Sequence, residues 1–266
     1  MNAPTPAHLI LAFVLAAGIA LAARAKGALT TSGALAAFVV GFLVFGFAGG
    51  PGAAALLLFF ITSTVLSRYR KRDKEKLATF EKGGERDAAQ VLANGGVAAL
   101  CALLVAVFPG STLPFIALLG ALAEANADTW ATEIGSLAKK PPCLITTFRL
   151  ASPGASGAVS VPGTLAALAG AALVATVAFS PAGFLAATTG GVAGALVDSL
   201  LGATLQVQYR CPVCRTLTEQ RAHCEGKITE PARGLPWLNN DIVNALATIT
   251  GALVATGLFV LIRSAR

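Results

Sequence analysis

Charged side chains are scarce in this sequence. Asp, Glu, Lys and Arg together make up 12% of the 266 residues, whereas an ordinary soluble domain carries roughly 25%. Hydrophobic residues make up 55%, and the mean hydropathy is +0.73. So few polar side chains cannot cover a globular surface that faces water. The composition therefore excludes a typical soluble protein and predicts a surface that faces lipid.

Two further shortages narrow the class. Aromatic residues make up only 7% of the chain, while there are 28 glycines; small residues let transmembrane helices approach closely. Gly190 and Gly194 form one such small-xxx-small pair, although the pattern is common.

No Lys or Arg precedes the first apolar segment, and the n-region of a signal peptide normally has one. We therefore expect this segment to be a membrane span and not a cleaved signal.

Apolar segments long enough to approach a membrane span recur along the whole chain, since a spanning helix needs about 20 apolar residues. Gly49-Gly50-Pro51-Gly52 and Ser180-Pro181 have the composition of tight turns. The sequence predicts an all-α, polytopic transmembrane bundle forming a single domain over residues 1–266. It has about eight spans, or seven if one is re-entrant. The spans are residues 8–23, 33–48, 52–67, 88–108, 114–135, 162–179, 181–204 and 241–262.

The positive charges fall on alternate connections between these spans. Of the 20 Lys and Arg residues, 18 lie at 24–26, 68–86, 136–160 and 205–236. The positive-inside rule places these connections in the cytoplasm and both termini outside. The net charge of +7 is then interpreted as topology and as affinity for anionic lipid or phosphate. Nucleic acid is not an expected partner.

Carboxylates inside apolar spans are costly and are candidates for function by default. Glu124 and Asp128 are four residues apart and share a helix face, and Glu133, Asp198 and Asp241 follow on this and later spans. With the predicted topology, four helices bring polar side chains to the cytoplasmic half of the bundle, and only Glu124 approaches the midplane. The amides that join them are Gln90, Asn94, Asn126, Asn240 and Asn244.

Carboxylates and amides beside a basic rim suit a hard cation that is bound together with phosphate oxygens, as Mg²⁺ often is. Glycines in Ser152-Pro153-Gly154-Ala155-Ser156-Gly157 would let backbone N–H groups approach an anion, although this turn has no Walker pattern. The basic rim consists of Lys82, Arg86, Lys139, Lys140 and Arg149.

Structural roles are alternatives for several of these residues. One buried carboxylate can pair with a nearby Lys or Arg, and Asn126 can serve as a hydrogen-bonding link between helices. Trp130 suits an anchor at the membrane interface. The mixed charges of residues 68–86 suit a solvated helix at the membrane surface.

Three of the five cysteines lie in the 205–236 connection. Cys211 and Cys214 form a Cys-x-x-Cys pair, and His223-Cys224 follows. Three thiolates and one imidazole make a tetrahedral ligand set for a structural zinc ion. A disulfide is disfavoured in a reducing cytoplasm, and reduced cysteines without a ligand are the alternative.

Five separated segments carry a family resemblance: residues 81–96, Ala127-Asp-Thr-Trp-Ala-Thr-Glu-Ile-Gly135, Leu144-Ile-Thr-Thr147, Asp198-Ser-Leu-Leu-Gly-Ala-Thr204 and Asn239-Asn-Asp-Ile-Val-Asn244. In this order they resemble the phytyl-phosphate kinase family of multi-span membrane proteins, from about Ser32 to the end of the last span. The family is also similar to CTP-dependent lipid kinases such as dolichol kinase. The resemblance implies transfer of a phosphoryl group from a nucleoside triphosphate to a prenyl monophosphate.

The resemblance and the residue pattern together assign roles. Asp128, Glu133 and Asp198 would hold Mg²⁺, and Lys139, Lys140, Arg149 and the 154–157 turn would bind nucleotide phosphates. Lys82, Glu124 and Asn126 complete the substrate contacts. The lipid phosphate would be held by Arg86, Gln90, Asn94, Asn240, Asp241 and Asn244, with Asp241 counted among the catalytic acids.

Two other functions compete with a kinase at the cytoplasmic membrane face. A transporter also has carboxylates in the membrane, but it requires polar residues towards both faces, and the outer half of this bundle is nearly bare. A cytidylyltransferase that makes a CDP-lipid would need the same metal and phosphate sites. It would release pyrophosphate, whereas a kinase releases a nucleoside diphosphate.

Overall fold

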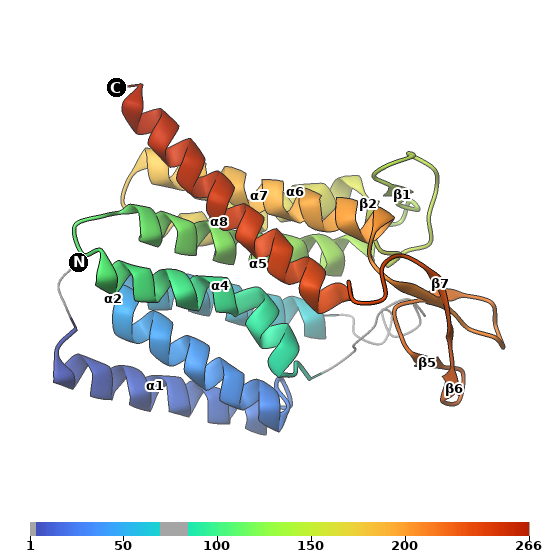
Figure 1. Cartoon of the computed structure of the whole chain (residues 1–266), viewed down its shortest axis with the longest axis horizontal. Helices are drawn as coiled ribbons and strands as arrows, with labels where there is room; N and C mark the ends of the chain where they lie inside the picture. The colour runs from blue at the N-terminus through green and yellow to red at the C-terminus, as the bar shows by residue number, and fades with distance from the viewer. Residues whose placement is uncertain (1–3, 70–84, 266) are drawn as a thin grey trace.

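The protein is a bundle of helices with small β-hairpins at one end (Figure 1). The computed structural model describes residues 4–69 and 85–265. The helices in these ranges are α1 (Pro6–Ala25), α2 (Thr31–Arg68), α4 (Ala88–Val107), α5 (Leu113–Gly135), α6 (Val161–Ala175), α7 (Pro181–Thr204) and α8 (Asn240–Ser264). Five of them, α1, α2, α4, α7 and α8, are long and apolar enough to cross a membrane.

Helix α2 is broken near its middle and turns back on itself. Gly49 has φ 62° and ψ −160°, a left-handed φ that glycine adopts without a Cβ clash. At the two ends of α2, Arg68 donates to the carbonyl of Lys26 and Arg24 donates to Thr31. Both ends therefore lie beside the end of α1. This confirms the predicted tight turn at the Gly-Gly-Pro-Gly segment.

The other spans match the prediction in part. Helix α6 has only 15 residues, fewer than the 162–179 segment, because the chain turns after Thr176 before Ser180 caps α7. Helix α5 has 23 residues, but Glu124, Asn126 and Asp128 lower its hydropathy. The count of eight spans therefore stays a prediction.

The sequence predicted an all-α protein. The structure differs in the charged connections, which contain short strands. Strands β1 (Cys143–Leu144) and β2 (Ala158–Val159) pair antiparallel. Strand β3 (Gln208–Arg210) pairs with β4 (Leu217–Thr218) and with β7 (Glu230–Arg233), while β5 (Ala222–His223) pairs with β6 (Lys227–Ile228). Strands of two to four residues are too short to produce a period-two pattern in the sequence.

The described parts of the basic connections gather at one end of the bundle, as the alternation of charge predicted. The backbone N–H of Arg86 donates to the carbonyl of Ala28 (3.1 Å), and the N–H of Thr30 donates to the carbonyl of Arg86 (3.0 Å). Figure 1 shows both chain termini at the opposite end from the labelled strands. We call the end that carries the strands the basic end. Its location in the cytoplasm remains a prediction of the positive-inside rule.

Helix α5 lies at the centre of the bundle and packs against α2, α4, α6, α7 and α8. Leu118, Leu119 and Leu122 are fully buried. Helices α5, α7 and α8 approach closely at glycines: a Cβ on Gly120 or on Gly190 would lie 2.4–2.5 Å from the carbonyl oxygen of Gly251. This tight packing fixes the part of α5 that leads into the basic end.

Candidate active site

A cavity of about 370 Å³ opens in the basic end of the bundle. Residues from α1, α2, α4, α5, α6, α7 and α8 line it, together with the 154–160 connection and part of the β3–β7 segment. It has a polar zone, whose charged and amide side chains come from α4, α5, α7, α8 and the connections, and an apolar zone, to which α1 and α2 contribute almost only apolar residues. This division is the main clue to what the cavity binds.

Most of the polar residues that the sequence singled out meet in the polar zone. Asp128 and Glu133 come from α5, and Asp198 comes from α7. The further predicted residues that line the cavity are Arg86, Gln90, Asn94, Gly154, Ser156, Gly157, Asn240 and Asn244. The convergence that the predicted topology implied is therefore present. It brings carboxylates, amides and one arginine to a single site.

Three carboxylates in the polar zone act on one another. The charges of Asp128 and Glu219 both repel that of Asp198, and one carboxylate oxygen of Asp198, Oδ2, is buried with no hydrogen-bond partner among the described residues. A buried, unpaired anion beside other anions is costly unless a cation joins them. The arrangement of Asp128, Asp198 and Glu219 therefore fits a divalent cation.

Arg86 is the one Lys or Arg residue among the described residues that line the cavity. Its backbone is fixed by the hydrogen bonds to Ala28 and Thr30, and the capping box of Asp87 and Gln90 starts α4 directly after it. Burial lowers the pKa of Arg86 from its ordinary value, and the nearby carboxylate of Glu133 partly opposes this shift. The guanidinium still stays charged at neutral pH and is positioned to bind an anion.

A hydrogen-bonded network closes one side of the cavity. The Glu219 carboxylate accepts from Ser156 and from Gln206 Nε2 (2.8 Å), and Gln208 Nε2 donates to Ser156 Oγ (2.8 Å). Arg233 Nε in turn donates to Gln208 Oε1 (2.8 Å). The network joins the 154–157 turn to the strands that follow α7.

Gly157 in that turn has a packing role. Its φ is +75°, and a Cβ there would lie 2.3 Å from the backbone nitrogen of Ala203 at the end of α7. Glycine is thus required for close approach between the turn and α7. Gly154 and Ser156 also line the cavity.

The apolar zone lies between α1 and the two halves of α2. Its lining is almost entirely aliphatic or aromatic and includes Ile19, Ala20, Val40, Phe45 and Leu56. The same cavity thus continues from charged groups into a hydrocarbon-like wall. A ligand that fills both zones must be amphipathic.

Several predicted residues do not line the cavity. Glu124 is 1% exposed, and it is packed against Gly194 of α7 and Gly251 of α8. Asn126 is buried and links three helices: it accepts from Thr62 (3.0 Å) and Ser63 (3.3 Å) and donates to the carbonyl of Gly170 (2.8 Å). This is the structural alternative that the sequence left open. Lys139, Lys140 and Arg149 are exposed, Asp241 is buried beside the cavity, and Lys82 lies outside the described residues.

Sequence reasoning missed the residues of the polar network. Glu219, Gln206 and Ser199 line the cavity, and Gln208 and Arg233 support it. Gln206 and Gln208 follow α7 at once, so their position next to Asp198 gave a weak signal. Glu219 gave none, because its place depends on how the strands pair.

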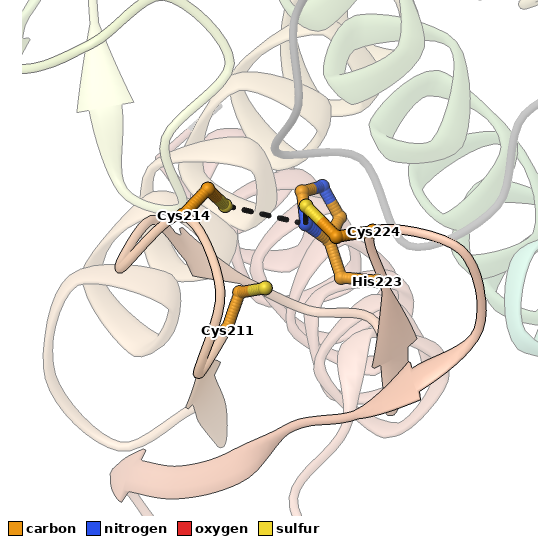
Figure 2. Close-up of side chains that lie close together, drawn as sticks. All are labelled: Cys211, Cys214, His223 and Cys224. Atoms are coloured by element: carbon orange, nitrogen blue, oxygen red, sulfur yellow. Dashed lines mark hydrogen bonds between the residues drawn. The ribbon is translucent and has the colours of Figure 1, made fainter.

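The structure also brings together the four predicted zinc ligands, Cys211, Cys214, His223 and Cys224 (Figure 2). Hydrogen bonds from Thr216 lower the pKa of the Cys214 thiol to about 6, and a bond from the backbone of Cys214 lowers the pKa of Cys211. Among the described residues this is the group of His, Cys, Asp and Glu side chains with the geometry to hold an ion by itself. Asp128, Glu133 and Asp198 share the cavity without forming such a group. A cation there would also need oxygens from a substrate.

Comparisons with known proteins agree with this picture. Protein PGR of Arabidopsis thaliana is 30% identical over 91% of this chain and 93% of its own length. An uncharacterized membrane protein of Methanocaldococcus jannaschii is 31% identical over 93% of this chain and 92% of its own. Protein VTE6, chloroplastic, of Arabidopsis thaliana is 27% identical over 85% of this chain and 64% of its own. No solved structure matches the chain.

The family model described as integral membrane protein DUF92 matches residues 14–252. That range includes every residue that lines the cavity, although α1 begins before it and α8 ends after it. Together with the relatives, the match confirms the resemblance that the five sequence segments indicated. The chain belongs to the DUF92 family of integral membrane proteins.

Proposed function

We propose that the protein transfers a phosphoryl group from a nucleoside triphosphate, with CTP favoured, to a prenyl monophosphate of the phytyl type. The product is a prenyl diphosphate, and the reaction takes place at the cytoplasmic face of the membrane. The observation that carries this proposal is the two-zone cavity. Carboxylates, amides and Arg86 line one zone, and the apolar walls of α1 and α2 line the other.

The acceptor lipid fits both zones at once. Its prenyl tail would lie against Ile19, Ala20 and Leu56, and its phosphate would lie near Arg86, Gln90 and Asn94. A guanidinium binds phosphate through charge-assisted hydrogen bonds, and the amides of Asn240 and Asn244 on α8 face the same space. A soluble metabolite would leave the apolar zone without a ligand.

The nucleotide phosphates are assigned to the opposite side of the polar zone. Gly154 and Ser156 would approach them through their backbone, and the exposed Lys139, Lys140 and Arg149 would form the rim at which the nucleotide enters. Asp128 and Asp198 would hold Mg²⁺ together with phosphate oxygens, because Mg²⁺ is usually bound by one or two carboxylates plus substrate phosphates. When bound, the ion would neutralise charge on the transferred phosphoryl group.

The chemistry makes few demands on the protein. An oxygen of the lipid phosphate attacks the γ-phosphorus, the bond from that phosphorus to its bridging oxygen breaks, and the nucleoside diphosphate leaves with the bridging oxygen. The nucleophile is already an anion, so no strong general base is needed. Catalysis then consists of positioning and charge stabilisation, which Arg86 and the amides of α4 and α8 would supply.

A product assay tests the proposal. The protein, purified in detergent, is incubated with Mg²⁺, a panel of prenyl monophosphates and each of CTP, ATP, GTP and UTP, and the products are identified by mass spectrometry. We expect prenyl diphosphate and nucleoside diphosphate in equal amounts. Pyrophosphate with a CDP-lipid would instead establish a cytidylyltransferase.

Matched variants tie the activity to the cavity. Asp128→Asn and Asp198→Asn keep the shape of each side chain and remove its charge, so we expect folded proteins with turnover lowered by a factor of about 100 or more. Glu230→Gln removes an exposed carboxylate on β7 and should turn over normally. Full activity in both aspartate variants would refute the assigned site, and no product from folded protein across the panel would refute the reaction.

A further inference from the structure

Four potential metal ligands face one point beside the cavity but outside it. The side chains of Cys211, Cys214, His223 and Cys224 converge between the turn that joins β3 to β4 and the β5–β6 hairpin (Figure 2). One ligand atom from each lies within 4.8 Å of all the others. None of these cysteines forms a disulfide.

The spacing suits a tetrahedral ion. Zinc binds sulfur at about 2.3 Å and nitrogen at about 2.0–2.1 Å, so tetrahedral geometry places neighbouring ligand atoms about 3.5–3.8 Å apart. His223 Nδ1 lies 3.5 Å from the sulfur of Cys214 and 3.2 Å from that of Cys224. Since all four ligand atoms lie within 4.8 Å of one another, shifts of at most about 1 Å would complete the shell.

The charges around the cluster suit the same ion. Zinc with three thiolates and a neutral imidazole has a net charge of −1. Arg210, Arg215, Arg221 and Lys227 lie within three residues of a ligand. Glu225 is the one carboxylate residue within the same distance along the chain, so the charge around the cluster is positive, opposite to that of the metal site.

The segment lacks an apolar core that would otherwise hold it. Between Arg210 and Arg233 the buried residues are Cys211, Thr218 and Thr229, and none of them is a large apolar side chain. Arg215, Cys224 and Glu225 also have positive φ, which persists only where the surroundings fix the backbone. Small units without a core are commonly stabilised by a structural metal.

We propose that Cys211, Cys214, His223 and Cys224 bind one structural zinc ion, and that this ion holds Glu219 against the cavity. Glu219 lies between the two ligand pairs in the chain and accepts hydrogen bonds from Ser156 and Gln206. The metal site therefore connects through one carboxylate to the 154–157 turn. This inference does not depend on the proposed reaction.

Metal content tests the zinc site directly. The full-length protein, purified in detergent without added metal, is expected to contain about one zinc per chain by mass spectrometry of the metal. Exchange for Co²⁺ should produce the strong visible absorption of a tetrahedral thiolate site. Cys214→Ser should lower the zinc content and weaken the sulfur-to-cobalt charge-transfer band, whereas Cys143→Ser, which changes a thiol in a different connection, should leave both unchanged.

Hydrogen exchange tests the link to Glu219. Removal of zinc with a chelator should increase exchange both in residues 208–233 and in residues 152–158, and readdition of zinc should reverse the change. Folded protein that contains less than about a tenth of an equivalent of zinc and gives no cobalt spectrum would overturn the metal site. Increased exchange confined to residues 208–233 would overturn the role of Glu219.

Discussion

Arg86 offers the sharpest test of how the cavity works, because its backbone and its side chain have separate tasks. The backbone bonds to Ala28 and Thr30 hold the connection between α1 and α2, and any residue can make them. The side chain lines the polar zone near Glu133. Replacement by methionine, Arg86→Met, keeps the backbone bonds and most of the aliphatic length. It removes only the guanidinium.

The expected loss follows from the hydrogen bonds that the guanidinium would make to a phosphate. A hydrogen bond to a charged group contributes about 1.5–3 kcal/mol, so the loss of one lowers kcat/KM roughly 10- to 150-fold. Stability should fall as well, because Arg86 offsets the charge of Glu133. In a double-mutant cycle with Glu133→Gln we expect a coupling energy of about 0.5–3 kcal/mol.

The assay combines thermal unfolding in detergent with turnover of a prenyl monophosphate. Arg86→Met should lower both, and adding Glu133→Gln should restore part of the thermal stability without restoring kcat/KM. Arg24→Met is the matched control, since Arg24 is exposed at the same end of the bundle and bonds only to Thr31 among the described contacts. Equal losses in Arg24→Met and Arg86→Met would refute the argument.

Three further predictions concern the packing and the shape of the cavity. Gly190→Ala should cost about 1–3 kcal/mol of stability, because its Cβ would meet the carbonyl of Gly251 at 2.5 Å. The control Gly96→Ala, with no described atom within 4 Å of the added Cβ, should be neutral or more stable by up to about 1 kcal/mol. Equal melting temperatures of the two variants would contradict the close packing of α7 and α8. Asn126→Ala should destabilise the bundle by about 1–3 kcal/mol, because the hydrogen bonds that join α5 to α2 and α6 are lost. Thr250→Ala is its control in the same unfolding measurement, since the described hydrogen bond of its hydroxyl lies within α8. Ala20→Phe should narrow the apolar zone and raise KM for a long prenyl phosphate by roughly tenfold or more, since each methylene excluded from the zone loses about 0.8 kcal/mol of burial free energy. KM for a short isoprenyl phosphate should change little. An equal rise in KM for both substrates would contradict the tail site.

Features that follow from local composition were predictable. The turn at Gly49 was clear because Gly-Gly-Pro-Gly cannot continue a helix, and the structure shows a left-handed φ there. The meeting of Asp128 with Asp198 was predictable because spans that alternate in direction place them at the same level. Both inferences need only the sequence and the dimensions of a membrane.

Features that depend on tertiary contacts were not predictable. Lys139 and Lys140 were expected in the site because of their charge, but they lie exposed outside the cavity, because α5 ends at Gly135 and the chain then leaves the bundle. Their contact with a nucleotide stays a proposal. The network around Glu219 could not be predicted, since it requires β3 to pair with β7 at sequence separations of 20 to 25 residues. Sequence periodicity carries no information about such short strands.

The carboxylates of the cavity include both predictable residues, Asp128 and Asp198, and one that was not predictable, Glu219. Asp128 and Asp198 lie on helices whose positions are set by close glycine packing of α5, α7 and α8, so their separation is fixed by the core of the bundle. Glu219 reaches the same cavity from a segment with almost no core of its own. A cation in the cavity would therefore be bound by Asp128 and Asp198 on rigid helices, together with Glu219 on a segment whose position is set separately. For this reason the state of the Cys/His cluster is expected to affect the cavity through Glu219 without moving Asp128 or Asp198.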